Sequence, residues 1–202
     1  MHNLQLTDDQ AMVVDTVKKL VADSVAPKAQ ELDEHRTFVR DWFDALAELG
    51  VYGLSVGEDQ GGAGMGLLPY VAALESVGGH SLSLARLWID QTQAALALER
   101  AGSPMLEDVA AGQRLVAVVG VAAGVRLEGG RLTGEAELVP AAMHADALLV
   151  FARSGDDGAG LALASVDPGR VERAALRSLG LASAGCGRVR FAGVDADVLA
   201  DG

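Results

Sequence analysis

The first half of the chain repeats its hydrophobic residues at helical spacing. Apolar side chains recur every three or four positions across 13–21 and again across 39–46, which places each set on one face of a helix. Thr7 and Gln10 form a capping-box pair ahead of the first segment, and Pro27 is expected to end that helix and to begin a short second one. The pattern predicts a bundle of helices.

Further helices are expected up to residue 113. Leu67, Val71 and Leu74 resume the helical period, and a longer apolar segment across 84–98 predicts a central, largely buried helix. A last short helix follows. The predicted boundaries are marked by turn and cap residues: Gly50, Gly78-Gly79, Gly102, Ser103-Pro104 and Gly112.

Beyond residue 113 the hydrophobic period changes from about 3.6 to 2, which is typical of strands. The expected strands are 115–121, 131–139, 147–151, 161–166 and 187–191. Gly129-Gly130 predicts a hairpin turn, and Ser154 to Gly158 a polar one. Within 131–139, the alternation places Leu132, Gly134, Ala136 and Leu138 on one face.

The resulting fold class is α+β, with an N-terminal α-helical bundle followed by a small antiparallel β-barrel or sandwich. The two expected domains are 1–113 and 114–202. Half of the 202 residues are hydrophobic, which is enough for a sizeable core.

The charge excludes several classes of partner. A net charge of −12, from 28 acidic and 16 basic residues, disfavours nucleic acids and anionic membrane surfaces. The single cysteine, Cys186, allows no disulfide within the chain and has no neighbouring histidine in sequence, so we interpret it as inert. No signal peptide and no apolar run of about 18 residues is found, so we expect a cytoplasmic protein without a membrane span.

Local motifs give no complete catalytic site. The segment 53–57 matches G-x-S-x-G around Ser55, but a predicted helix precedes it where a nucleophile elbow needs a strand. A serine hydrolase stays as a remote alternative. The glycine-rich stretch 57–66 lacks the Lys-Ser/Thr of a phosphate-binding loop. The histidines show no metal-ligand spacing, so no metal site is expected.

A longer pattern is more informative. The stretch 46–66 resembles the LxELGLxGLxVPEExGGxGxG motif of the acyl-CoA dehydrogenases. Features similar to that family follow in the same order along nearly the whole chain: Leu6 to Gln10, Ala26-Pro27, Ala73 to Glu75, Ala101 to Ser103, Leu179-Gly180, Arg188 to Phe191 and Val194.

The resemblance implies a helical domain, a middle β-domain and a C-terminal four-helix domain. It also implies FAD, placed between domains and between subunits of a dimer or tetramer. The family oxidises acyl-CoA thioesters, with a glutamate taking the α-proton while flavin N5 takes the β-hydride. The implied context is fatty acid or lipid metabolism.

The departures from the family pattern are as informative as the matches. The catalytic glutamate belongs to the C-terminal domain, so we expect no catalytic residue in this chain. The family's TEPxAGSD loop is replaced by 118–124, which includes Gly120 and Ala123. Leu138 and Pro140 stand where the NGxKxWIT strand carries an aromatic and a hydroxyl residue. These four eroded positions predict that FAD binds weakly or not at all to this chain alone.

Three hypotheses follow. In the first, the chain is a degenerate or accessory subunit that works in a homo- or hetero-oligomer with a flavin-bearing partner of the same family. In the second, it is the N-terminal two-thirds of a longer dehydrogenase. In the third, it is a flavin-free structural or acyl-CoA-binding module, and four residues resemble the position that lines the family's acyl pocket: Leu87, Trp88, Ile89 and Thr92.

Overall fold

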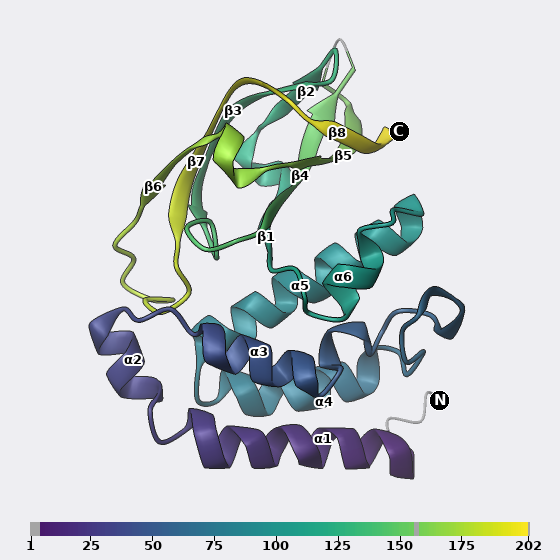
Figure 1. Ribbon diagram of the computed structural model, residues 1–202, viewed down its shortest axis with the longest axis vertical. Helices are drawn as coiled ribbons and strands as arrows, with labels where there is room; N and C mark the ends of the chain where they lie inside the picture. Colours follow the sequence, from purple (N-terminus) through teal and green to yellow (C-terminus); the bar gives the residue numbers. More distant parts are fainter. Residues whose placement is uncertain (1–4, 156–157, 202) are drawn as a thin grey trace.

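The computed structural model describes residues 5–155 and 158–201. The predicted α+β fold is confirmed, with helices in the first half of the sequence and strands in the second. In Figure 1 the helices form the lower half of the molecule and the strands the upper half, with α5 and α6 next to the sheet. The assignment of the two halves to domains 1–113 and 114–202 stays a prediction.

The helical half agrees closely with the expected pattern. The Thr7 backbone N–H donates to Gln10 Oε1 at 3.0 Å and the Gln10 N–H to Thr7 Oγ1 at 3.3 Å, so the capping box is confirmed. A π-helical turn, Val21–Val25, extends the first helix. The α-helices are α1 Asp8–Leu20, α2 Ala29–His35, α3 Arg40–Glu48, α4 Leu67–Gly78, α5 Leu82–Ala101 and α6 Leu106–Ala110.

Helix α5 is the central element of this half, as predicted. Leu84, Leu87 and Leu98 are fully buried, and Gly102 ends the helix with a left-handed φ of 61°. The helix α4 is found where the sequence placed it, but Leu67 and Val71 are exposed. This part of the apolar stripe therefore faces away from the core.

The strands build one sheet in the order β6-β7-β3-β2-β4-β5-β8, with β1 added to β4. Most neighbours are antiparallel, whereas β1 and β2 both run parallel to β4. The strand bounds are β1 Val116–Val119, β2 Arg126–Glu128, β3 Arg131–Val139, β4 Ala147–Ser154, β5 Gly160–Val166, β6 Glu172–Ala175, β7 Gly187–Asp195 and β8 Asp197–Asp201.

The predicted turns and alternation are largely observed. Gly129 and Gly130 have positive φ angles of 55° and 77° between β2 and β3. In β7, Val189 and Phe191 are buried while Arg188 and Arg190 are exposed. The predicted polar turn Ser154 to Gly158 includes residues 156 and 157, which lie outside the described residues.

The predicted orientation of Leu138, on the same face of the strand as Leu132 and Ala136, is wrong. The register between β3 and β7 shifts between Ala136 and Val139, so Val139 takes the buried position. Leu138 adopts a left-handed φ of 54° and keeps 48% of its surface exposed. A bulge of this kind turns one side chain to the opposite face, which a strict period of 2 cannot anticipate.

Candidate functional site

A cavity of about 470 Å³ lies between α5, the segment that follows β1 and the end of β3. A volume of this size is typical of small-molecule sites. Arg86 reaches it from α5, and Glu135 and Glu137 from β3. The rest of its lining is formed by apolar and backbone surface, including Val118, Val119, Gly120, Ala122, Ala123, Ala136, Leu138, Val139 and Pro140.

All four eroded positions line this one cavity. Gly120 and Ala123 contribute from the turn after β1, and Leu138 and Pro140 from the end of β3. Two segments about fifteen residues apart in the sequence are thus brought together by the sheet. Their part in flavin binding stays a prediction.

Leu138 presents its side chain at the cavity through the bulge in β3. A left-handed conformation costs a non-glycine residue roughly 1–2 kcal/mol. The next turn repeats the feature, since Ala141 has a φ of 57°. The end of β3 therefore has two non-glycine residues in a left-handed backbone conformation, which is energetically unfavourable for them. This strained segment lies at the cavity wall.

Arg86 is held at the cavity by Asp90, one turn further along α5. The Arg86 Nε donates to Asp90 Oδ2 at 3.1 Å, and Nη2 lies 2.7 Å from Oδ1 as an ion pair without hydrogen-bond alignment. The Asp90 side chain is 2% exposed and that of Arg86 is 40% exposed. Burial raises the pKa of Asp90 to about 6, although the charge and hydrogen bond of Arg86 lower it.

The two glutamates of the cavity wall share one cation. Arg188 on β7 lies 3.3 Å from Glu135 through Nε and 2.8 Å from Glu137 through Nη2. All three side chains are partly exposed. Their negative charge is therefore half compensated, and one net negative charge remains on this side of the cavity.

The lining does not suit a flavin. A flavin protein supplies polar groups that hold the pyrophosphate and hydrogen-bond the ring nitrogens. Among the described residues that line the cavity, Arg86 is the one cation, and no hydroxyl or carboxamide side chain is present. Pro140 also has no backbone N–H to donate. Glu135 and Glu137 would repel a pyrophosphate.

The four residues predicted for an acyl pocket lie next to this cavity in sequence but outside its lining. Leu87, Trp88 and Thr92 are buried, and Ile89 is half-buried. Trp88 packs edge-on against Tyr52 and Tyr70, with ring centroids 6.4 and 5.6 Å apart. These contacts belong to the core of the helical half, so an acyl-binding role for the four stays a prediction.

The sequence analysis missed Arg86. Its signal was present: an arginine and an aspartate spaced i,i+4 enclose three apolar residues in a helix predicted to be largely buried, where charges need a partner. The position of β3 against α5 could not be foreseen from that spacing, because it depends on contacts between distant segments.

The glycine-rich stretch 57–66 is a closed turn rather than a phosphate cradle. The backbone N–H groups of Gly61, Gly62, Ala63 and Gly64 all donate to carbonyls of residues 53–58. They cannot also be offered to an anion. Gly62 is required by packing, since a Cβ there would overlap the Val56 carbonyl.

The remaining motifs also have structural roles. Ser55 Oγ donates to the Gly66 carbonyl at 3.0 Å, and a 3-10 turn, Val51–Gly53, precedes it in place of a strand. Across residues 5–155 and 158–201, no group of three or more His, Cys, Asp or Glu side chains could hold a metal ion. No helix in the same ranges has the length and hydropathy needed to cross a membrane.

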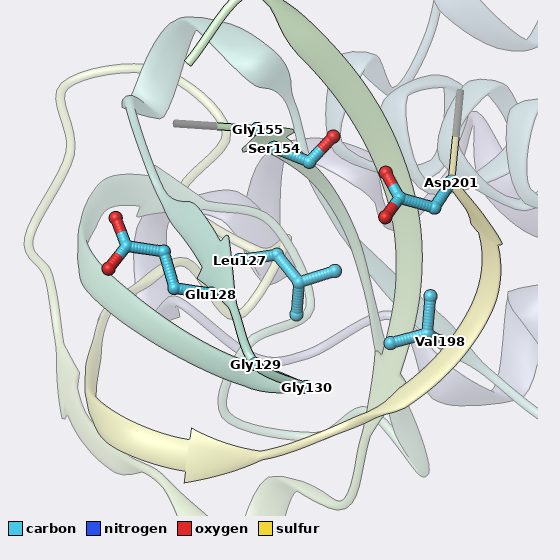
Figure 2. Close-up of a pocket in the computed structure, with 8 residues that line it drawn as sticks. All are labelled: Leu127, Glu128, Gly129, Gly130, Ser154, Gly155, Val198 and Asp201. Atoms are coloured by element: carbon cyan, nitrogen blue, oxygen red, sulfur yellow. The ribbon is translucent and has the colours of Figure 1, made fainter. Parts of the chain in front are cut away.

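A second cavity opens at the far end of the sheet. It measures about 530 Å³ and lies between the β2–β3 hairpin, the end of β4 and β8. Figure 2 shows the carboxylates of Glu128 and Asp201 on opposite sides of it, with Leu127 between them and Val198 on the same side as Asp201. Within the described residues its lining carries no basic side chain and no histidine, so it offers no cationic side chain to an anion.

Comparison with known proteins gives a consistent result. Residues 7–108 match the family model described as the acyl-CoA dehydrogenase N-terminal domain. The chain is 32% identical to benzylmalonyl-CoA dehydrogenase of Aromatoleum aromaticum over 176 residues, which is 77% of this chain and 46% of the relative. It is 33% identical to acyl-CoA dehydrogenase FadE27 of Mycobacterium tuberculosis over 207 residues, covering 95% of this chain and 54% of the relative.

Solved structures agree with the sequence relatives. The ChsE4-ChsE5 complex of M. tuberculosis superposes with a TM-score of 0.77 at 25% identity, covering 97% of this chain and 57% of that chain. A glutaryl-CoA dehydrogenase of Mycobacterium smegmatis in complex with FADH2 gives a TM-score of 0.82 at 19% identity, over 97% of this chain and 55% of that chain. The chain thus spans about half the length of the curated relatives reported above.

Proposed function

The chain belongs to the acyl-CoA dehydrogenase family, and from this premise we propose that it is a degenerate or accessory subunit that acts beside a flavin-bearing partner of the same family. In this role it stabilises or covers the partner's site and contributes no catalytic base. We propose a homo- or hetero-oligomer in the cytoplasm as its working form, in fatty acid or lipid metabolism.

The lining of the cavity between α5 and β3 carries this proposal. The family scaffold is retained, yet apart from Arg86 the described side chains at the cavity are apolar or acidic, where a flavin needs neutral and basic donors. A protein that keeps its fold and loses its polar site is expected to work through another subunit. One structural neighbour, ChsE4-ChsE5, is described as a complex of two different proteins, which supports this mode of assembly.

The proposal is tested by the visible absorption of the chain purified alone and of the complex captured with it from its native host. We expect no flavin bands from the chain alone and flavin bands from the complex, with a second dehydrogenase-type subunit identified by mass spectrometry. Stoichiometric flavin in the chain alone, or the absence of any dehydrogenase-type partner, contradicts the proposal.

The length relationship favours one alternative, in which the sequence is the N-terminal part of a longer dehydrogenase. The relatives extend well beyond the part that this chain matches. Under this alternative the native protein, detected in its host with an antibody against the helical half, has about twice the mass of this chain. A native mass equal to that of the 202-residue chain excludes it.

A further inference from the structure

The guanidinium of Arg86 is only partly used by the protein itself. Its Nε and Nη2 atoms face Asp90, at 3.1 and 2.7 Å from the two carboxylate oxygens. No further hydrogen bond or ion pair of Arg86 is found among the described residues, so Nη1 remains for a ligand. Arg86 lines the cavity, and its side chain keeps 40% of its surface exposed.

Asp90 fixes the direction of this arginine. The Asp90 side chain is 2% exposed, so its carboxylate has lost nearly all its hydration. This desolvation costs free energy that an apolar residue at the same position would not lose. Its two contacts tie Nε and Nη2 of Arg86 to a buried group one turn further along α5 and restrict the side chain. An arginine pre-oriented in this way loses little conformational freedom when it binds an anion.

The opposite wall limits which anions can enter. Glu135 and Glu137 share Arg188, so one uncompensated negative charge faces the cavity. A polyanion such as pyrophosphate meets this repulsion. A single carboxylate carries less charge than a polyanion and meets less repulsion, and Arg86 is the cation of the described lining that can pair with it. The apolar lining, with Val118, Val119 and Leu138, suits a hydrocarbon body.

We propose that this cavity binds a monocarboxylate carried on an apolar body, with Arg86 taking the carboxylate and Leu138 contacting the hydrocarbon. The site goes beyond the accessory role proposed above, because it needs neither a flavin nor a partner subunit. The same chemistry is found in a free carboxylic acid and in the far carboxylate of a dicarboxylic thioester.

The first experiment measures binding of hexanoate and of hexanamide to the 202-residue chain by isothermal titration calorimetry. The two probes have the same shape and differ in charge. We expect hexanoate to bind at least tenfold more tightly, the factor that corresponds to about 1.4 kcal/mol and that a charge-assisted hydrogen bond supplies. Equal binding of the two probes overturns the proposal. Absent binding of hexanoate overturns it as well, unless a dicarboxylic thioester binds through Arg86 in the last experiment below.

Variants then identify the residue. Arg86→Met is expected to abolish the preference for hexanoate. Arg114→Met is the matched control, because Arg114 is 41% exposed, pairs with Asp108 at 3.3 Å and lies outside the cavity lining. An unchanged preference in Arg86→Met, or an equal loss in both variants, contradicts the assignment.

A second variant covers the case in which Arg86→Met does not fold. Leu138→Glu places a negative charge on the opposite wall at a position that is already 48% exposed. Both probes lose the hydrocarbon contact of Leu138, and hexanoate alone also meets the new charge, so hexanoate is expected to weaken at least tenfold more than hexanamide. Equal effects on both probes overturn the carboxylate assignment.

The source of the carboxylate is distinguished with thioesters. Adipyl-pantetheine and hexanoyl-pantetheine differ by a terminal carboxylate in place of a methyl group. Tighter, Arg86-dependent binding of adipyl-pantetheine supports the site and identifies a dicarboxylic thioester. Arg86-dependent binding of hexanoate alone supports the site and identifies a free acid. Binding of hexanoyl-pantetheine as tight as that of the adipyl form, together with no Arg86-dependent binding of hexanoate, overturns the proposal.

Discussion

Phe38 and His144 stack face to face, with ring centroids 4.0 Å apart and planes 9° from parallel. Phe38 precedes α3 in the helical half, and His144 lies in the turn between β3 and β4. The stack therefore joins the two halves of the molecule. Gly185, in the segment before β7, packs against both rings with a left-handed φ of 60°.

The first prediction is that Gly185→Ala destabilises the protein. A Cβ at this position would overlap the His144 ring and lie 2.9 Å from the Phe38 ring. The left-handed backbone adds roughly 1–2 kcal/mol of strain for any L-residue. We expect a loss of more than about 2 kcal/mol in the free energy of unfolding, measured by urea denaturation.

The control variant Gly193→Ala separates the steric overlap with the rings from the backbone strain. Gly193 has a φ of 70°, and a Cβ there meets nothing within 4 Å. The control variant should therefore lose only the backbone contribution. An equal loss of unfolding free energy in the two variants would show that the Phe38 and His144 rings move aside without cost. The stack would then contribute little to joining the two halves.

His144 also predicts a pH dependence. Its pKa is lowered from the usual value by burial and by the charges of Arg173 and Arg40. Below pH 6.5 the unfolded chain binds this proton more readily than the folded one, so stability falls as the pH falls below 6.5. The variant His144→Phe keeps an aromatic stack. In it we expect the free energy of unfolding, measured by urea denaturation, to change less between pH 7 and 5.5 than in the wild type. An equal pH dependence in the two proteins refutes this assignment.

Asp90 predicts a pH dependence of stability opposite to that of His144. Burial raises its pKa to about 6 from the ordinary value of 3.8, so between these values the folded state binds the proton more tightly. Its contribution to stability therefore increases as the pH falls from about 6 towards 4. Relative to Asp90→Asn, the wild type should gain on the order of 1–3 kcal/mol over this range. The measurement is urea denaturation of both proteins at pH 7 and pH 4.5, and a constant difference rules the effect out.

The elements that local patterns specify were predictable. The capping box at Thr7, the left-handed glycines at 50 and 102 and the hairpin at Gly129-Gly130 are all observed. Each depends on residues close in sequence. The strands β6 and β8 were not predicted, because they are short and mostly exposed, and only pairing with β7 and β5 makes them strands.

The candidate site was only partly predictable. The four eroded positions were found by resemblance, and they do gather in one cavity. The facing of Leu138 was wrong because the bulge before Val139 is set by the β3–β7 register rather than by local alternation. Arg86 was missed for a similar reason, since the wall that makes it a cavity residue comes from β3, about fifty positions further along the chain.

The last prediction concerns Gln91, which connects α5 to the start of the sheet. Its side chain is fully buried, and its Nε2 donates to the carbonyls of Val109 and Arg114 at 2.8 and 2.7 Å. The Val116 N–H donates to its Oε1 at 3.1 Å. In Gln91→Met these backbone groups lose their partner in the interior, and each such group costs about 1–3 kcal/mol. We expect a loss of about 3 kcal/mol or more in urea denaturation, against less than about 0.5 kcal/mol for the exposed control Gln93→Met. A small loss in Gln91→Met would mean that water replaces the amide, and that the start of β1 does not depend on α5 for its position.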